Sequence, residues 1–363
     1  DILIQLEEDG LAEDTIVFFF ADHGFGQPRY KRWMYNTGIQ VPFIVHVPQK
    51  FRRFLDTSSG ERREELVSFI DFAPTVLHLC QTEIPGEMVG QTFLGPERDE
   101  PRNFVYGARS RADDIYDVSR AIRDERYIYI RNYMPHRSYI RQAIIFSDRK
   151  RSFSELWRVK AAGNLPEAGR NMFQPKPMHE LYDLEKDPDE LHNLAASDEH
   201  AARTQDMHKS LQAWILQSRD TGFLHEAEMM LRSEDSNPYE MAHDPSQFNL
   251  EKILSSAETV GDTSFSLDAL ATNLNDSDSG VRFWAAEAIL ARLDEAESLI
   301  SELKNSVNDE SPSVRIVSAE TLCHLDHTDE ALKILASDLQ SQLHPTVVLQ
   351  AASALREIGE KAG

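Results

Sequence analysis

Continuous apolar runs near the amino end of the chain predict buried strands. Residues 15–20 and 41–47 are two such runs, and residues 66–70 form a shorter third candidate. Uninterrupted apolar runs of this length are typical of strands that are buried on both faces of a parallel sheet. A helix is expected to follow, with Asp71 as its N-cap. Residues 1–100 are therefore predicted to be α/β, built on a parallel sheet.

The pattern changes after residue 100. Residues 126–131 alternate strictly between polar and apolar, and residues 103–108 and 180–184 are further candidate strands. Strict alternation predicts an antiparallel sheet with one face in solvent. A helix is expected over residues 199–219, with its apolar residues along one side. Together these patterns predict an α+β subdomain over residues 101–232.

The last part of the chain repeats itself. Val281, Val314 and Val347 are 33 residues apart. The same offset relates Arg282 to Arg315, Ala286 to Ala319 and Ala352, and Ile289 to Leu322 and Leu355. A fixed period of this size, with small and aliphatic residues at helical spacing, predicts stacked helix pairs. Residues 249–363 are therefore expected to be all-α and to resemble HEAT repeats, after a polar linker at residues 233–248.

Composition and charge limit the classes of partner. With 363 residues the chain is long enough for two or three domains. Its 61 acidic and 38 basic residues give a net charge of −23, which disfavours nucleic acid and anionic membranes. No apolar run approaches the roughly 18 residues of a membrane span. The repeats hold 20 acidic and 8 basic residues, which favours a solvated acidic surface over the alternative, a docking face for a cationic protein partner.

One cluster of residues suggests chemistry. Asp22 and His23 follow the first apolar run directly, and Gly24 allows the backbone to turn there. Ligands of open α/β sheets bind at the carboxyl ends of strands, where a carboxylate and an imidazole can hold a divalent cation. Lys31 lies between Arg29 and Arg32 in a short cationic segment. A lysine in this place could bind an anionic oxygen of a substrate beside the metal.

These residues stand in blocks that resemble type I (formylglycine-dependent) sulfatases of the alkaline phosphatase-like superfamily. The blocks cover residues 15–24, Lys31, residues 35–42, 71–77, 84–90, 120–124, 180–188 and 193–194, in the order of the family. The resemblance extends over about residues 1–232. It implies the fold of the carboxyl-terminal portion of a sulfatase catalytic region, a partial parallel-sheet domain with an α+β subdomain, followed here by the HEAT-like repeats.

Roles follow from the resemblance only at matching positions. It implies that Asp22 and His23 are metal ligands and that Lys31 contacts the sulfate group. The implied metal is Ca²⁺, while a histidine ligand leaves Mn²⁺, Mg²⁺ or Zn²⁺ open. His136, on an expected loop after the strand at 126–131, is a weaker candidate for contact with a glycan. Arg109 and Arg111 are expected to form surface ion pairs.

The chain departs from the family pattern at the nucleophile. Formylglycine is made from Cys or Ser in a C/S-x-P-x-R motif, and neither Cys80 nor Cys323 stands in one. The paired aspartates that complete the metal site of the family are also missing. The expectation is an amino-terminally truncated fragment without sulfatase activity of its own, whose parent enzyme hydrolyses sulfate esters or sulfamates, with formylglycine in the missing part.

Two alternatives remain open from the sequence. One is a phosphodiester or phosphonate ester hydrolase of the same superfamily, which a threonine nucleophile in place of the C/S-x-P-x-R motif would favour. The other is an interaction protein whose HEAT-like repeats bind a protein partner and whose hydrolase part is an inactive remnant. The resemblance also leads us to expect a sulfated small molecule or glycan as the substrate, and a periplasmic or extracellular location.

Overall fold

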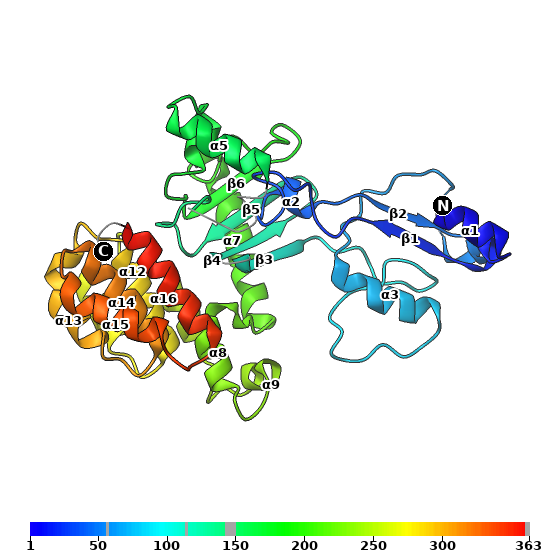
Figure 1. The fold of residues 1–363 in the computed structure, drawn as a ribbon. Helices are drawn as coiled ribbons and strands as arrows, with labels where there is room; N and C mark the ends of the chain where they lie inside the picture. The colour runs from blue at the N-terminus through cyan, green and yellow to red at the C-terminus, as the bar shows by residue number, and fades with distance from the viewer. Residues whose placement is uncertain (56–57, 113–114, 142–149, 360–363) are drawn as a thin grey trace. The chain divides into compact units, whose positions relative to one another are not determined.

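The computed structural model describes residues 1–55, 58–112, 115–141 and 150–359 (Figure 1). Contacts along the chain divide it into two compact units. Unit 1 comprises Asp1–Gly107, Ala121–Tyr129 and Leu181–Leu194. Unit 2 comprises Ala108–Arg120, Ile130–Glu180 and Ala195–Gly363. Among the described helices none is both long and apolar enough to cross a membrane.

Unit 1 begins with helix α1 (Ile2–Glu8), which matches the apolar spacing at the start of the chain. Strands β1 (Val17–Phe20) and β2 (Phe43–His46) then pair antiparallel, with Val17 opposite His46 and Phe20 opposite Phe43. The prediction of a parallel arrangement is therefore wrong for this pair. A run of apolar residues indicates that a strand is buried, but the direction of its neighbour depends on the connection between the two strands.

The third predicted strand is also wrong. Residues Phe69–Asp71 form a 3-10 helix that leads into α3 (Phe72–Leu79). The helix is where the sequence predicted it, but the carboxylate of Asp71 does not cap it. Asp71 instead accepts hydrogen bonds from the main-chain nitrogens of Ser68 (2.7 Å) and Gln91 (2.8 Å) and pairs with Arg102. Asp71 thus ties three separate segments together.

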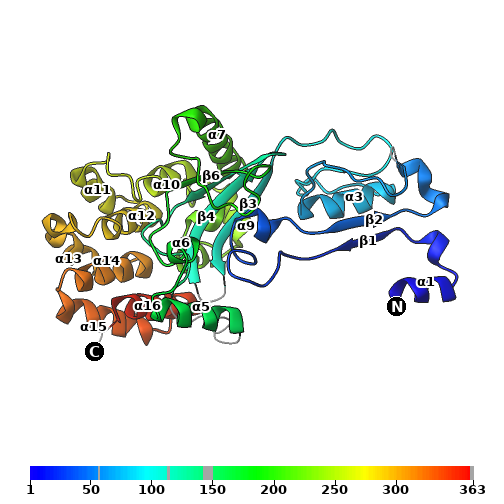
Figure 2. The same cartoon turned by 90° about the horizontal axis from the view of Figure 1, so that it is seen from above.

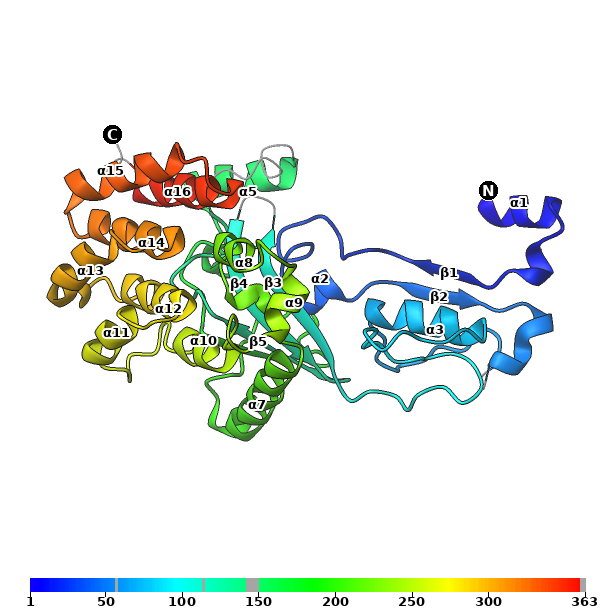
Figure 3. The ribbon, with the colours of Figure 1, turned by 90° about the horizontal axis from the view of Figure 1, so that it is seen from below.

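The β1–β2 pair has one covered and one open face. Phe18 and Phe43 contact Phe72 of α3 and Phe93, which makes an aromatic cluster on one side of the pair. Figure 3 shows α3 lying beside β1 and β2. On the other side Phe19 and Ile44, which are register partners, stay 61% and 60% exposed. Two strands carry too little packing to be stable without such support, so the aromatic cluster holds this part of unit 1.

A second sheet has the strand order β3-β4-β5-β6. Its strands are β3 (Val105–Ala112), β4 (Ile115–Arg123), β5 (Tyr127–Asn132) and β6 (His179–Asp183). Three were predicted and β4 was not. The expected wet face is wrong for β5, because residues 128–132 are all buried, including Arg131. Arg131 pairs with Glu258 at 2.9 Å, so its charge is compensated inside the fold.

The helices between β5 and the repeats belong mainly to unit 2. They are α5 (Arg151–Ala161), α6 (Glu167–Asn171), α7 (Ala201–Gln217), α8 (Glu226–Arg232) and α9 (Pro238–His243). Helix α7 confirms the prediction for residues 199–219, and it buries Met207, Leu211 and Ile215. The predicted linker at 233–248 is folded instead. It contains α9, which starts at the N-cap Asn237 and Pro238 and buries Met241 completely.

The predicted repeat lies on stacked helices (Figure 2). After α10 (Leu250–Ala257), the repeat positions fall on α12 (Ser279–Leu290), α14 (Pro312–His324) and α16 (Pro345–Ile358). Helices α11 (Leu267–Leu274), α13 (Ile300–Ser306) and α15 (Thr328–Leu339) pack beside them. All of α12 is buried, whereas α11, α13 and α15 each bury only two or three residues.

Equivalent arginines show how closely the repeats agree. The Nη1 atom of Arg282 donates to the carbonyl oxygens of residues 276 and 277, and that of Arg315 donates to those of residues 309 and 310. Each arginine also pairs with an aspartate further along the chain, Arg282 with Asp309 at 2.7 Å and Arg315 with Asp338 at 2.6 Å. The 33-residue period is therefore a period of polar contacts as well as of packing.

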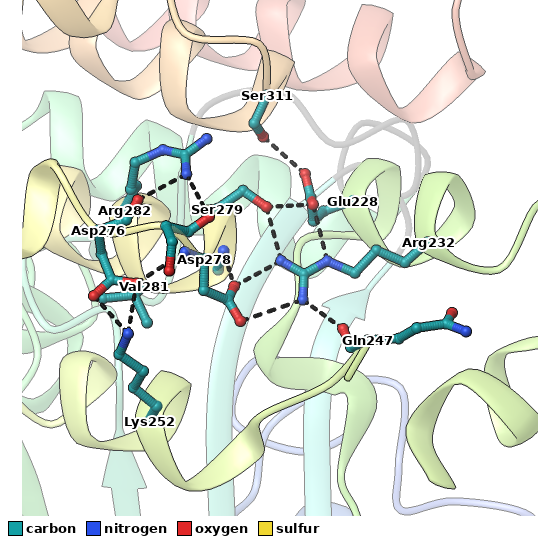
Figure 4. A network of polar contacts seen from close by, with 12 residues as sticks. Glu228, Arg232, Gln247, Lys252, Asp276, Asp278, Ser279, Val281, Arg282 and Ser311 are labelled. Carbon is teal, nitrogen blue, oxygen red and sulfur yellow. Dashed lines mark hydrogen bonds and ion pairs between the residues drawn. The ribbon is translucent and has the colours of Figure 1, made fainter. Parts of the chain in front are cut away.

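Helix α8 contacts the N-terminal ends of two repeat helices, α12 and α14. Glu228 accepts hydrogen bonds from the hydroxyls of Ser279 and Ser311, the latter at 2.8 Å (Figure 4). Arg232 donates to Asp278 (2.7 Å), Ser279 (2.7 Å) and the carbonyl of Gln247 (2.8 Å). One short helix thus joins the first turns of α12 and α14.

Candidate functional site

The segment between β1 and β2 carries Asp22, His23 and Lys31. Two stretches of its backbone approach each other closely at glycines. The amide of Gly24 donates to the carbonyl of Gly38 at 2.9 Å. A Cβ atom at Gly24 would lie 2.1 Å from the carbonyl oxygen of Thr37, and one at Gly38 would lie 2.3 Å from that of Tyr30. Only glycine fits at both places, because any side chain would collide with main-chain atoms.

Asp22 and His23 can share one cation. Asp22 Oδ1 lies 3.5 Å from His23 Nε2, a separation that suits two ligand atoms each about 2.0–2.5 Å from the same ion. His23 Nδ1 lies 2.7 Å from the carbonyl oxygen of Gly24. Because a carbonyl can only accept, Nδ1 must carry a proton, and Nε2 is the ring nitrogen that faces Asp22 and could bind a cation. A carbonyl partner for the other ring nitrogen is usual for metal-binding histidines.

Asp22 and His23 are exposed to solvent and supply only part of a coordination shell. The Asp22 side chain is 83% exposed, and the described residues contain no group of three or more His, Cys, Asp or Glu side chains arranged for a metal ion. Two donors of this kind fit part of a coordination shell. They fit either a hard cation through the carboxylate or a softer one through the imidazole.

Lys31 sits in a loop of unusual backbone shape. Arg29 and Arg32, on either side of it, have φ angles of 68° and 86°, which are costly for residues other than glycine and cluster at functional sites. The amide of Lys31 donates to the carbonyl of Phe25 at 3.0 Å. Within the described ranges no ion pair involves the half-buried Lys31, so its ammonium group is available to an anion.

Of the three cations in this segment, Arg29 has a structural role. Its guanidinium donates to the carbonyls of Asp189 (2.9 Å) and Glu190 (2.6 Å) and stacks on the ring of Tyr35 at 4.2 Å. Both partners come from the turn after β6, which also belongs to unit 1. Sequence reasoning did not find this contact, because the partners are about 160 residues away in the chain.

The structure does not bring His136 to the other three. Its side chain is buried in unit 2, with Nε2 3.1 Å from Oε2 of Glu287 on α12. Burial lowers the pKa of His136 well below its usual value, so the ring is neutral. His136 does lie on a loop after β5, as expected, but the burial of its ring does not support contact with a glycan.

The two arginines at the start of the second sheet form ion pairs as expected, but Arg109 does so inside the fold. Arg109 is only 7% exposed and lies 3.5 Å from Asp117. Arg111 makes a close pair with Glu226, at 2.6 Å. The prediction of a surface pair is thus wrong for Arg109, because Asp117 on the neighbouring strand is itself buried.

Comparison with known proteins points to one enzyme class. Residues 1–82 match the sulfatase family. Over 263 residues, which are 72% of this chain and 43% of the relative, the chain is 38% identical to an ulvan-active sulfatase of Formosa agariphila. Over 235 residues, which are 60% of this chain and 45% of the relative, it is 24% identical to the human N-sulphoglucosamine sulphohydrolase. The chain thus spans less than half the length of these curated relatives.

A solved structure gives a weaker likeness. A protein crystallised with its substrate D-glucosamine-2-N,6-O-disulfate matches with a TM-score of 0.40 and 21% identity, over 61% of this chain and 38% of that one. A TM-score of this size does not establish a shared fold. The sequence similarities are what support a sulfatase.

Proposed function

We propose that these residues form part of a sulfatase that hydrolyses sulfate esters or sulfamates of glycans. The observation that carries the proposal is the geometry at the end of β1, where Asp22 and His23 present two donors to one cation in the segment that matches the sulfatase family. The ulvan-active and sulphoglucosamine-active relatives support a sulfated glycan as the substrate class. A periplasmic or extracellular location belongs to the same proposal.

Each residue has one task in this proposal. Asp22 and His23 hold a divalent cation, with Ca²⁺ as the first candidate and Mn²⁺, Mg²⁺ or Zn²⁺ as the others. When bound, such a cation supplies positive charge beside the sulfate oxygens, where negative charge builds up as the S–O bond breaks. Lys31 donates a charge-assisted hydrogen bond to a sulfate oxygen, and Arg29 holds the loop that carries it.

The nucleophile lies outside this set of residues. The 363 residues contain no C/S-x-P-x-R motif, from which formylglycine is made. The proposal therefore assigns binding and charge stabilisation to this chain and the attacking group to another segment. The HEAT-like repeats have no part in the chemistry, and their acidic surface could receive a cationic protein partner.

Metal binding tests the proposal directly on the chain as it stands. Calorimetric titration with Ca²⁺ or Mn²⁺ should show one site in the wild type, and D22N and H23A should each weaken it at least tenfold. The matched control is D14N, which alters an exposed aspartate that pairs with Lys50 and should leave metal affinity unchanged. Equal binding by the wild type and D22N would overturn the metal assignment.

Activity tests the second half of the proposal. A polypeptide that joins these residues to a formylglycine-bearing segment should release sulfate from a sulfated polysaccharide, while the 363-residue chain alone should release none. K31A in that polypeptide should lower kcat/KM by about 10²–10³, the usual effect of removing one group that stabilises transition-state charge. K50A is its control. Hydrolysis of phosphodiesters in place of sulfate esters would contradict the proposed substrate class.

A further inference from the structure

Three buried cationic side chains and one largely buried one lie close together in unit 2, whereas Lys31 belongs to unit 1. Arg109 lies on β3, Arg137 and Arg141 lie in the stretch after β5, and Lys176 lies just before β6. Main-chain contacts bring the last two stretches side by side. The amide of Ile140 donates to the carbonyl of Met172 (3.0 Å), and that of Lys176 donates to the carbonyl of Pro135 (2.7 Å).

Carboxylates compensate only part of this charge. Lys176 Nζ lies 2.6 Å from Asp117, which Arg109 approaches to 3.5 Å on its other oxygen. Arg137 makes a two-pronged pair with Glu320 on α14, at 2.5 and 2.8 Å. Asp117 and Glu320 are thus the fully buried carboxylates that pair with Lys176, Arg109 and Arg137. Burial of a charge without a partner costs several kcal/mol.

Arg141 is the cation of this group without a close carboxylate partner among the described residues. It is only 8% exposed, and its ion-pair contact is a 3.9 Å approach of Nη1 to Glu357 on α16. Its Nε and Nη2 atoms have no hydrogen-bond partner. Burial and the neighbouring Arg137 lower the pKa of Arg141 to about 10, which reflects the missing negative charge.

The neighbours of Arg141 also lack acceptors. Nε of Arg137 and the single N–H of the neutral His136 ring have no hydrogen-bond partner. Glu287 is a further buried carboxylate, and its Oε2 atom also has no hydrogen-bond partner. Burial raises its pKa to about 7, so it carries only part of a charge at neutral pH. Buried donors outnumber buried acceptors, and buried unsatisfied donors are rare unless water or an ion meets them.

The three cations around Asp117 act on it together. Burial raises the pKa of Asp117, but the charges of Lys176, Arg109 and Arg141 outweigh burial and lower it. All three cations therefore lie close enough to influence the same carboxylate. A ligand that only accepts hydrogen bonds and carries negative charge would satisfy what this cluster lacks.

We propose that Arg141, together with Arg109 and Lys176 beside Asp117, binds a small tetrahedral oxyanion, sulfate or phosphate, inside unit 2. The oxyanion accepts from Nε and Nη2 of Arg141, the planar fork that suits two oxygens of such a group. This site is separate from the proposed reaction and from Lys31, which belongs to unit 1. It holds Arg141 beside Glu357 of α16.

Calorimetry and thermal unfolding test the site on the full chain. Wild type, R141Q, R141K and the control R158Q are titrated with sodium sulfate, sodium phosphate and, at equal ionic strength, sodium chloride. Arg158 is an exposed arginine that pairs with Glu155 and suits the control. A K31A arm separates this site from the proposed substrate site.

We expect sulfate or phosphate, but not chloride, to bind wild type, R158Q and K31A with equal affinity, and to raise the melting temperature of each. In R141Q the affinity should fall at least about tenfold, as for loss of a charge-assisted pair of hydrogen bonds. The affinity of R141K should lie between those of wild type and R141Q. Preference for one of the two oxyanions identifies the ligand.

A second readout separates a binding site from a structural ion pair. In chloride alone R141Q should unfold at the same temperature as wild type or higher, because it removes an uncompensated charge, and only the sulfate-dependent increase should disappear. No oxyanion binding by wild type, binding that R141Q leaves intact, or an equal loss of stability in R141Q with and without sulfate would each overturn the proposal. If R141Q does not fold, the affinity of R141K decides.

Discussion

The guanidinium of Arg29 donates a 2.6 Å hydrogen bond to the main-chain oxygen of Glu190, and the carboxylate of Glu190 accepts one of 2.9 Å from the amide of Asn36. In both contacts the loop between β1 and β2 donates and Glu190 accepts, so they join the same two segments of unit 1. They fasten the loop that carries Lys31 at a point before it and a point after it. The loop between β1 and β2 is therefore held by a segment far away in the sequence.

Replacing Arg29 should loosen this loop. R29A removes two hydrogen bonds from a charged donor and its stacking on Tyr35, so the free energy of unfolding should fall by about 2 kcal/mol. Urea unfolding followed by fluorescence measures the change. R62A, which breaks an exposed pair with Glu64, should change it by less than about 0.5 kcal/mol. Equal effects of R29A and R62A would contradict the role of Arg29.

Two neighbouring phenylalanines of β1 should behave in opposite ways. Phe18 packs against Phe43, Phe72 and Phe93, so F18S should destabilise unit 1 by about 3 kcal/mol or more. Phe19 is 61% exposed, so F19S should leave stability nearly unchanged and reduce self-association through the open apolar face. Urea unfolding and sedimentation velocity measure the two effects. The prediction fails if F19S is the more destabilising change.

Trp284 should be the most sensitive residue of the first repeat. Its Nε1 donates to the carbonyl of Phe223 at 2.8 Å, and the side chain is fully buried. W284F leaves that carbonyl without its donor and opens space, which should cost about 2–4 kcal/mol. W157F, at a half-buried tryptophan that contacts Phe173, is the control and should cost clearly less. Thermal unfolding monitored by circular dichroism compares the two variants.

Asp183 should contribute to acid unfolding. The hydrogen bond from Arg126 lowers the pKa of Asp183 to about 2. A lowered carboxyl pKa gives stability that is present above the unfolded value of about 4 and is lost as the pH falls toward 2. D183N should therefore remove part of the loss of stability between these pH values, by less than about 1 kcal/mol because Arg126 is partly exposed. Denaturation at stepwise lower pH, with D235N at an exposed aspartate as control, checks this.

Glu287 should give the opposite pH dependence. Burial raises its pKa to about 7, so the folded chain holds a proton that the unfolded chain releases near pH 4. This stability is fully present below pH of about 4 and is lost as the pH rises through about 7. E287Q should abolish that loss, which is on the order of 2–3 kcal/mol. Unfolding of wild type and E287Q at matched pH values from 5 to 9 measures it, and parallel curves would contradict the prediction.

The sequence predicted best where one rule determines both pattern and structure. The 33-residue spacing of Val281, Val314 and Val347 appears as three buried valines on α12, α14 and α16. A helix that packs on two neighbours must keep small and aliphatic residues at fixed positions. The antiparallel pairing of β1 and β2 was missed because their apolar residues do not record strand direction. Residues 233–248 looked like a linker, although Asn237 and Pro238 are residues that commonly start a helix.

In the candidate site, too, local features could be predicted from the sequence and contacts across the fold could not. Asp22 and His23 could be chosen because they follow a strand, and the structure places their donor atoms 3.5 Å apart. The support from Asp189 and Glu190 depends on contacts across the fold, which no local pattern contains. The loop position of His136 was predicted correctly, but its burial against Glu287 of α12 was not, because that contact also joins distant parts of the sequence.

The bridging position of Glu228 bears on how this chain can be divided in the laboratory. Its carboxylate holds Ser279 and Ser311 at once, and Trp284 is anchored on Phe223. A cut at residue 248 would separate Glu228 and Phe223 from the helices that they contact. An excised repeat segment would therefore expose apolar side chains that are buried in the full chain, and it would be prone to nonspecific binding. Binding studies of the repeats should therefore retain α8 and the residues that precede it.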